Sequence, residues 1–135
     1  MNIGSVDHVN IKSPRFDESL HLYHDILGLS MGRLPDVSRM AGAGAMPRSA
    51  YLCDATGRAI IHMSAAEGDA SARTGAIDHI ALRCEGFAEF ARRLEESDTE
   101  FRKAIYPEIG VAQLVLTDPN GIKIELSFSV EDAQS

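Results

Sequence analysis

The stretch VDHVNI at residues 6–11 decides the fold, because it returns as IDHIAL at residues 77–82. A second echo follows in the same order, since LCDATG at residues 52–57 returns as LTDPNG at residues 116–121. Similar segments that return in the same order are the mark of a repeated structural unit. The chain is therefore predicted to contain two copies of one module.

Each copy is predicted to fold as a strand, a helix and three further strands. Residues 6–11 alternate in polarity and are rich in β-branched types, which is typical of a strand. Ser13 and Pro14 suit the N-cap and first turn of a helix that Gly28 is expected to close. The remaining strands are predicted at residues 29–34, 50–54 and 59–64, and again at residues 100–105, 112–117 and 122–128.

This order of elements predicts an α+β fold built from two βαβββ modules. The first module is assigned residues 1–65, the linker residues 66–75 and the second module residues 76–135. A chain of 135 residues suffices for one domain, or for two half-size modules that share a core. Residues 36–48 are rich in glycine and alanine and are expected to form a mobile loop.

The composition limits the kinds of partner. The formal net charge is −7 and the sequence pI is about 5.1, so neither nucleic acid nor an anionic membrane surface is expected as a partner. No stretch approaches the ~20 apolar residues that a membrane span needs. The first ten residues lack the basic and apolar pattern of a signal peptide. Cys53 and Cys84 form no CxxC motif and are read as buried, reduced thiols, so a cytoplasmic location is expected.

Four polar residues occupy positions that the repeat relates to one another. His8 pairs with His79, and His62 in IHM pairs with Glu125 in IEL. Side chains alternate along a strand, so Glu125 is predicted to face away from the helix and towards whatever the sheets enclose. The same alternation places Asp7 and Asp78 on the opposite face, and they are assigned no metal role.

Three imidazoles and a carboxylate predict a site for one divalent metal ion. A carboxylate within an apolar strand is costly unless it is paired or bound to a cation. A single strand histidine is more often structural, but four competent ligands at repeat-related positions favour a metal site. Neutral imidazole and carboxylate suit Fe²⁺, Ni²⁺, Zn²⁺, Mn²⁺ or Co²⁺, and no thiolate biases the site towards zinc.

The chain resembles the vicinal oxygen chelate superfamily, which includes glyoxalase I, extradiol dioxygenases and bleomycin resistance proteins. Four segments carry the resemblance: DHV at 7–9, YHDILGL at 23–29, DHIAL at 78–82 and DPNGIKIEL at 118–126. The resemblance implies paired βαβββ modules with curled mixed sheets that enclose a metal at His8, His62, His79 and Glu125. It also implies a homodimer, and a small-molecule substrate that chelates the metal through neighbouring oxygens.

The resemblance leaves three functions open. Lyase or isomerase chemistry through an enediolate-like intermediate would use all four ligands, with Glu125 or His62 moving the proton. The glyoxalases of this superfamily carry a second carboxylate where this chain has His62. An Fe²⁺ extradiol-type dioxygenase on a catechol-like substrate would use His8, His79 and Glu125 as ligands and His62 as an acid or base. Such enzymes carry a tyrosine where this chain has Val115. The third hypothesis is a metal-free resistance protein that binds a drug or metabolite.

Three further residues are predicted to contact the substrate. Asn10 lies two residues beyond His8 and should share its face of the strand. Arg33 and Arg48, like Arg39 between them, flank the glycine-rich loop and could bind a carboxylate or phosphate. The loop at residues 34–49 and the segment at residues 106–111 are expected to shape the pocket.

Overall fold

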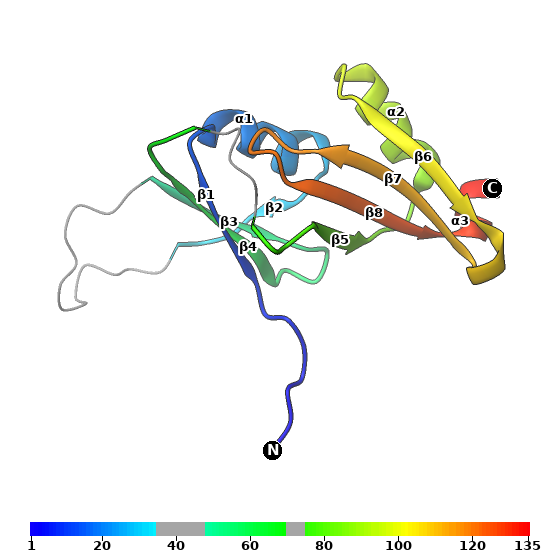
Figure 1. Cartoon of the computed structure of the whole chain (residues 1–135), viewed down its shortest axis with the longest axis horizontal. Helices are drawn as coiled ribbons and strands as arrows, with labels where there is room; N and C mark the ends of the chain where they lie inside the picture. The colour runs from blue at the N-terminus through cyan, green and yellow to red at the C-terminus, as the bar shows by residue number, and fades with distance from the viewer. Residues whose placement is uncertain (35–47, 70–74) are drawn as a thin grey trace. The chain divides into compact units, whose positions relative to one another are not determined.

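The computed structural model describes residues 1–34, 48–69 and 75–135, and the chain divides into two compact units. Unit 1 comprises Met1–Asp69 and unit 2 comprises Ala70–Ser135. Each unit holds one four-stranded mixed sheet (Figure 1). Within the described ranges, no helix has both the length and the apolar character needed to cross a membrane.

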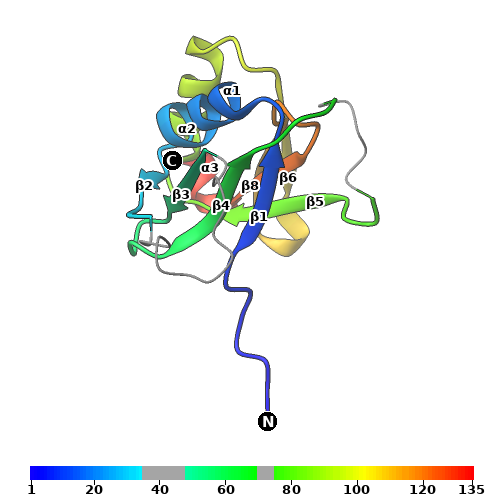
Figure 2. The same ribbon diagram turned by 90° about the vertical axis from the view of Figure 1, so that its left-hand side faces the viewer.

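The sheet of unit 1 has the strand order β1-β4-β3-β2, and these four strands are labelled in Figure 2. Strand β1 lies parallel to β4, and the other neighbours are antiparallel. A helical segment follows β1 in the chain and connects it to the rest of the sheet. The elements are β1 (Val9–Ser13), α1 (Phe16–Leu20), the π-helical turn η1 (His21–Ile26), β2 (Ser30–Met31), β3 (Ser49–Cys53) and β4 (Ala59–Ala65).

The sheet of unit 2 repeats this order as β5-β8-β7-β6, with β5 parallel to β8. The same topology in both units confirms the duplicated α+β fold that the sequence repeat predicts. The elements are β5 (His79–Arg83), α2 (Phe87–Glu96), β6 (Phe101–Tyr106), the 3₁₀ turn η2 (Pro107–Ile109), β7 (Val111–Thr117), β8 (Lys123–Ser129) and α3 (Val130–Gln134).

The first strand begins later than the sequence pattern predicts. Residues 6–8 precede β1, whose ladder starts with Val9 opposite Ile61. The guanidinium of Arg58 instead donates hydrogen bonds to the backbone carbonyls of Val6 and Asp7. Strand β2 is also shorter than predicted, because only Ser30 and Met31 pair with β3.

The first helix also differs from its prediction at its start. Ser13 is still paired with Ala65 in the sheet, so the helix begins at Phe16 and Arg15 takes the N-cap position. The Ser13 hydroxyl accepts a hydrogen bond from the Arg15 N–H at 3.0 Å. Gly28 closes the helical segment with a φ of 82°, as predicted.

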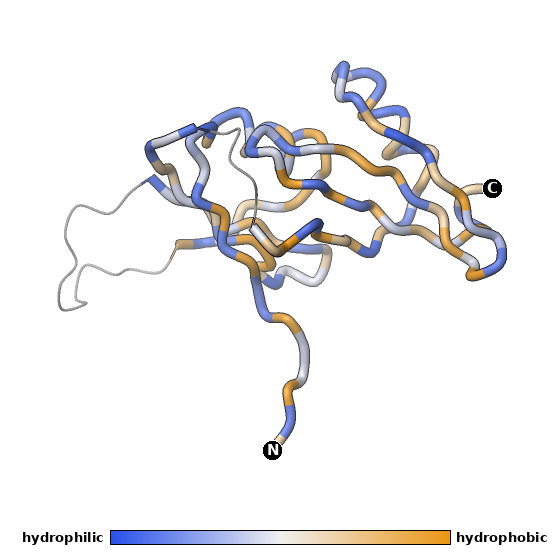
Figure 3. The backbone as a smooth tube through the Cα atoms, in the orientation of Figure 1, coloured by the Kyte–Doolittle hydropathy of each residue, from blue (hydrophilic) through white to orange (hydrophobic). Residues whose placement is uncertain are grey.

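Each sheet buries one face against its helix and leaves the other face polar. Leu52 and Tyr23 are fully buried in unit 1, and Leu94, Leu114 and Ile124 are fully buried in unit 2. The alternation of polar and apolar residues along β8 appears as blue and orange in Figure 3. Residues 36–47 of the predicted glycine-rich loop, Arg39 among them, and residues 70–74 of the predicted linker lie outside the described residues. Cys53 is buried, Cys84 is half-buried, and both are free thiols.

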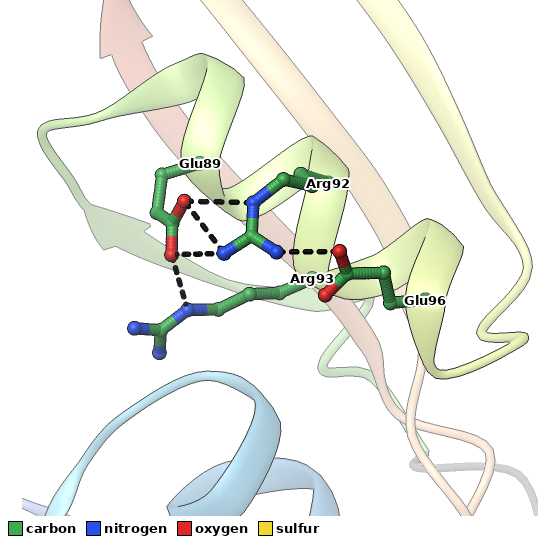
Figure 4. Close-up of polar contacts among 4 residues, drawn as sticks. All are labelled: Glu89, Arg92, Arg93 and Glu96. Carbon is green, nitrogen blue, oxygen red and sulfur yellow. Dashed lines mark hydrogen bonds and ion pairs between the residues drawn. The ribbon is translucent and has the colours of Figure 1, made fainter.

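Helix α2 carries an exposed ion-pair cluster of Glu89, Arg92, Arg93 and Glu96 (Figure 4). The Arg92 guanidinium donates to both oxygens of Glu89, at 2.8 and 2.9 Å, and Arg93 Nε donates to Glu89 Oε1 at 2.9 Å. These contacts, Arg92 first and then Arg93, lower the pKa of Glu89 from 4.5 to about 2. The cluster stabilises the outer face of the helix, where i,i+3 and i,i+4 pairs meet.

Replacing Glu89 by glutamine is expected to remove a pH-dependent share of stability. A carboxyl whose pKa is lower in the folded than in the unfolded state stabilises the fold above its unfolded pKa. That contribution is lost as the pH falls from about 4.5 to about 2, the range set by the pKa shift. The difference in Tm between wild type and Glu89→Gln should therefore shrink over this range, and also in high salt because the cluster is exposed. A difference that stays constant from about pH 6 to pH 2 would contradict the prediction.

Candidate metal centre

Unit 1 brings His8 and His62 into direct contact. Their rings are stacked with centroids 3.7 Å apart, and Tyr51 stacks on the other side of His62 with centroids 3.9 Å apart. The register explains this grouping, because both Tyr51 and Asn10 lie opposite His62 on neighbouring strands. His62 is thus held between two aromatic rings, and Asn10 lies next to it on the same face of the sheet.

Unit 2 brings His79 and Glu125 together. Nε2 of His79 lies 3.5 Å from Oε2 of Glu125, and the Glu125 side chain is only 16% exposed. The side-chain amide of Gln113 donates to the same Glu125 oxygen at 2.9 Å. Gln113 is on β7 and Glu125 on β8, so the amide orients the carboxylate from the neighbouring strand.

An aspartate fixes one nitrogen of His8 and of His79. The Nδ1–H of His8 donates to Oδ2 of Asp7 at 2.6 Å, and the Nδ1–H of His79 donates to Oδ2 of Asp78 at 2.8 Å. Because Nδ1 carries the proton in both rings, Nε2 is the nitrogen left to bind a metal ion.

The prediction that Asp7 and Asp78 lie on the opposite face from the histidines is therefore wrong, because each is hydrogen-bonded to the histidine that follows it. They precede β1 and β5, so strand alternation does not govern where they point. The signal that could have revealed them is the repeated Asp-His dipeptide itself.

Hydrogen bonds, neighbouring charges and burial shift the pKa of three side chains near the candidate ligands. The hydrogen bond from His8 lowers the pKa of Asp7, and the hydrogen bonds from His79 and Lys123 lower the pKa of Asp78. Lys123 Nζ lies 2.7 Å from the Asp78 carboxylate. Burial, followed by the neighbouring His8, lowers the pKa of His62. His62 is thereby kept in the neutral form, which is the form that binds a metal.

Each unit holds two donors of the kinds that divalent metals accept. Unit 1 supplies two imidazoles, and unit 2 supplies one imidazole and one carboxylate with its lone pairs towards the histidine. Neutral imidazole and carboxylate are the donors that iron, nickel, manganese, cobalt and zinc accept. Among residues 1–34, 48–69 and 75–135, the structure gathers the four candidates two by two and not as a cluster of three or more.

The three predicted substrate contacts lie in different places. Asn10 is beside His62, as described above. The Arg48 guanidinium lies 2.7 Å from Asp17 and covers the Phe16 ring at 4.7 Å, so it engages helix α1. Arg33 is exposed just after β2. The structure therefore brings only Asn10 together with a candidate ligand.

The comparisons with known proteins agree with this architecture. The family model described as glyoxalase/bleomycin resistance protein/dioxygenase superfamily matches residues 5–126. The chain belongs to this superfamily. Among curated proteins, it is similar to Glyoxylase I 4 of Arabidopsis thaliana, with 27% identity over 132 residues that cover 93% of this chain and 71% of that protein.

Solved structures of other proteins share the fold. A glyoxalase/dioxygenase from Nostoc punctiforme matches with a TM-score of 0.72 and 16% identity over 93% of this chain and 90% of that one. TnmS3, an antibiotic binding protein from Streptomyces sp. CB03234, matches with a TM-score of 0.66 and 17% identity over 96% of this chain and 98% of that one. These likenesses confirm the glyoxalase/dioxygenase-like fold, which serves both enzymes and binding proteins.

Proposed function

We propose that this member of the superfamily is a divalent-metal-dependent enzyme that chelates two neighbouring oxygens of a small organic substrate. Its chemistry is that of a lyase or isomerase acting through an enediolate-like form of the substrate. His8, His62, His79 and Glu125 hold the metal. The observation that carries the proposal is the matched pair of Asp-His contacts, at 2.6 and 2.8 Å, which leave Nε2 of His8 and His79 available as donors.

The residues divide the work between binding and proton transfer. A bound divalent ion would supply Lewis-acid polarisation of the substrate oxygens. Glu125, whose Oε2 accepts a hydrogen bond from Gln113, would take a proton from a carbon next to those oxygens. His62 would be the second proton carrier when its ring nitrogen is not bound to the ion, because it occupies the repeat position equivalent to Glu125. Asn10 beside it binds a substrate oxygen.

Tyr51 favours a second function, that of an Fe²⁺ extradiol-type dioxygenase. Tyr51 lies opposite His62 in unit 1 as Val115 lies opposite Glu125 in unit 2, so the two positions are equivalent. The tyrosine missing at Val115 is thus present at the repeat-related position, stacked on His62. In this version His8, His79 and Glu125 hold the iron, and His62 and Tyr51 act on a catechol-like substrate.

Metal content is the decisive measurement for this proposal. Elemental analysis of the full chain, purified without oxygen and then reconstituted with single divalent ions, should give about one ion per chain. Nickel, cobalt, zinc or manganese as the tightest ion supports the lyase or isomerase, whereas iron with oxygen uptake supports the dioxygenase. No retained ion after reconstitution would overturn both enzymes and leave a protein that binds a drug or metabolite.

His62→Ala tests whether this histidine is a ligand. We expect weaker metal retention, because a four-donor site loses one imidazole. Tyr51→Phe keeps the ring that packs on His62 and serves as the matched control, with metal affinity within about twofold of wild type. Unchanged metal affinity in His62→Ala would remove His62 from the ligand set and leave it as an acid or base only.

Asp78→Asn and Asp7→Asn should weaken metal binding by about 10-fold to 100-fold, the usual effect of losing a partner that orients a ligand histidine. Each change removes an acceptor charge from an Nδ1–H contact without removing a donor of the metal. Asp17→Asn, which alters a carboxylate on helix α1, is the matched control. Nitrogen-15 spectra of the metal-free imidazoles provide a second readout. Loss of the Nδ1–H tautomer in the two test variants alone is the expected result, and an unchanged tautomer would contradict it.

We propose in addition that the protein acts in the cytoplasm as a homodimer on a small molecule. The free state of Cys53 and Cys84 supports a reducing compartment. Light scattering coupled to size-exclusion chromatography tests the subunit number.

A further inference from the structure

The polar face of the unit 2 sheet carries cations on both of its edge strands. Side chains in register on neighbouring strands share a face of the sheet. Arg83 on β5 lies opposite Ser127, which lies opposite Gln113. Arg102 on β6 lies opposite Val115, which lies opposite Glu125. Arg83 and Arg102 therefore flank Glu125 and Gln113 from opposite edges.

The spacing of a sheet sets the scale of this arrangement. With strands about 4.8 Å apart and residues about 3.3 Å apart, the Cα atoms of Arg83 and Arg102 lie roughly 8–10 Å from that of Glu125. Arginine side chains are long enough to reach a group held above Gln113 and Ser127 from either edge. An anion there would lie about two residues, or ~7 Å, along the strand from Glu125.

Neither arginine has a protein partner in the part of the chain that the structure describes. By contrast, Arg92 and Arg93 of the same unit are bound to glutamates, and Lys123 is bound to Asp78. In a chain with a net charge of −7, two unpaired guanidinium groups on one face are available for an external anion.

A hollow of about 1090 Å³ opens along this face, with Arg83, Gln113 and Ser127 in its lining. Its size is that of a small-molecule site. Two acids also line it. The Asp132 carboxylate accepts hydrogen bonds from the backbone N–H groups of Gly86 and Phe87, at 2.7 and 3.4 Å. Glu85 follows the end of β5, two residues after Arg83 and therefore further than Arg83 from the register position of Glu125. Neither of these two acids lies on the strands between Gln113 and Arg102.

We propose that Arg83 and Arg102 form an anion subsite, and that the substrate is a small carboxylate or phosphate. Its anionic group binds the two guanidinium groups beside Gln113, whose amide remains hydrogen-bonded to Glu125 and Ser127, a few atoms away from the oxygens that are chelated. The substrate class rests on the proposed function, whereas the anion subsite itself does not need the metal. A planar guanidinium group can donate two parallel hydrogen bonds to two oxygens of a carboxylate or phosphate, which favours arginine over lysine at such a subsite.

The test uses the full chain without metal, at constant ionic strength. Acetate and inorganic phosphate are titrated against it, and ethylene glycol serves as an uncharged probe. Nitrogen-15 spectra should show saturable shifts of the Arg83 Nε–H and the Gln113 side-chain amide with both anions and none with the glycol. Arg83→Gln and Arg102→Gln should each weaken the apparent affinity by roughly fivefold or more, as expected for a charge-assisted contact.

Arg93→Gln removes the same charge from the same unit and is the matched control, with affinity expected within about twofold of wild type. Equal weakening in all three variants would mean that net charge alone attracts the anion, and would overturn the subsite. Shifts that do not saturate, or that avoid Arg83 and Gln113, would overturn it as well. Because no metal is present, failure of metal binding and failure of this subsite are observed separately.

Discussion

Glu125→Ala is expected to lower the affinity of the protein for its metal ion by about 100-fold or more. Glu125 is the one carboxylate among the four proposed donors, and its charge balances part of the charge of a divalent ion. Gln113 already orients the carboxylate through a hydrogen bond at 2.9 Å, so loss of Glu125 removes a donor that the sheet holds in position. Competition with a chelator, read as metal retained per chain, measures the change.

Two controls make this result specific. Glu125→Gln keeps the size of the side chain and should lose nearly as much affinity, because the charge and not the volume matters. Glu95→Gln removes a carboxylate that is ion-paired with Lys103 on the surface of unit 2, and should retain metal like the wild type. Metal content that is unchanged in Glu125→Ala would refute the site, provided that the variant keeps the wild-type amide spectrum.

Leu114→Ala is expected to destabilise the fold by about 2–5 kcal/mol, the largest effect on stability among the changes considered. Leu114 lies at the centre of β7 and is fully buried. Removing its side chain loses the transfer free energy of the buried methyl and methylene groups and leaves a cavity that the sheet and helix α2 cannot close. Urea unfolding followed by circular dichroism measures the difference in the midpoint.

Ile109→Ala is the matched comparison, since this apolar residue of the same unit is 72% exposed. Its substitution should change the free energy of unfolding by no more than about 0.5 kcal/mol. Comparable losses in the two variants would mean that β7 does not pack as the structure places it.

The repeat made most of the fold predictable from sequence. The two strand orders follow from matched segments, and β3, β4, β7 and β8 lie within one or two residues of their predicted bounds. These strands are bounded by turn sequences whose backbone preferences are local. The sequence pattern overestimates the length of β2, because the length of an edge strand depends on its partner and only two residues of β3 pair with β2.

The contacts around the four candidate ligands could not be predicted from the sequence. The contacts of Tyr51 with His62 and of Gln113 with Glu125 depend on strand register, which joins residues that no local pattern relates. The sequence pattern misplaces Asp7 because it predicts a strand over residues 6–8, whereas Arg58 binds the backbone of Asp7 outside the sheet. The four ligand assignments remain a prediction that metal analysis has to test.

The parallel pairing of β1 with β4 and of β5 with β8 has a consequence for the order of folding. Each hairpin, β3-β4 or β7-β8, joins neighbours in the chain and closes with little loss of entropy, whereas β1 and β5 must return across a helix and two strands. We therefore expect these first strands to join their sheets late and to detach early. Since His8 directly precedes β1 and His79 begins β5, the same rare openings would release half of the donors. Bound metal should thus slow amide hydrogen exchange most in β1 and β5.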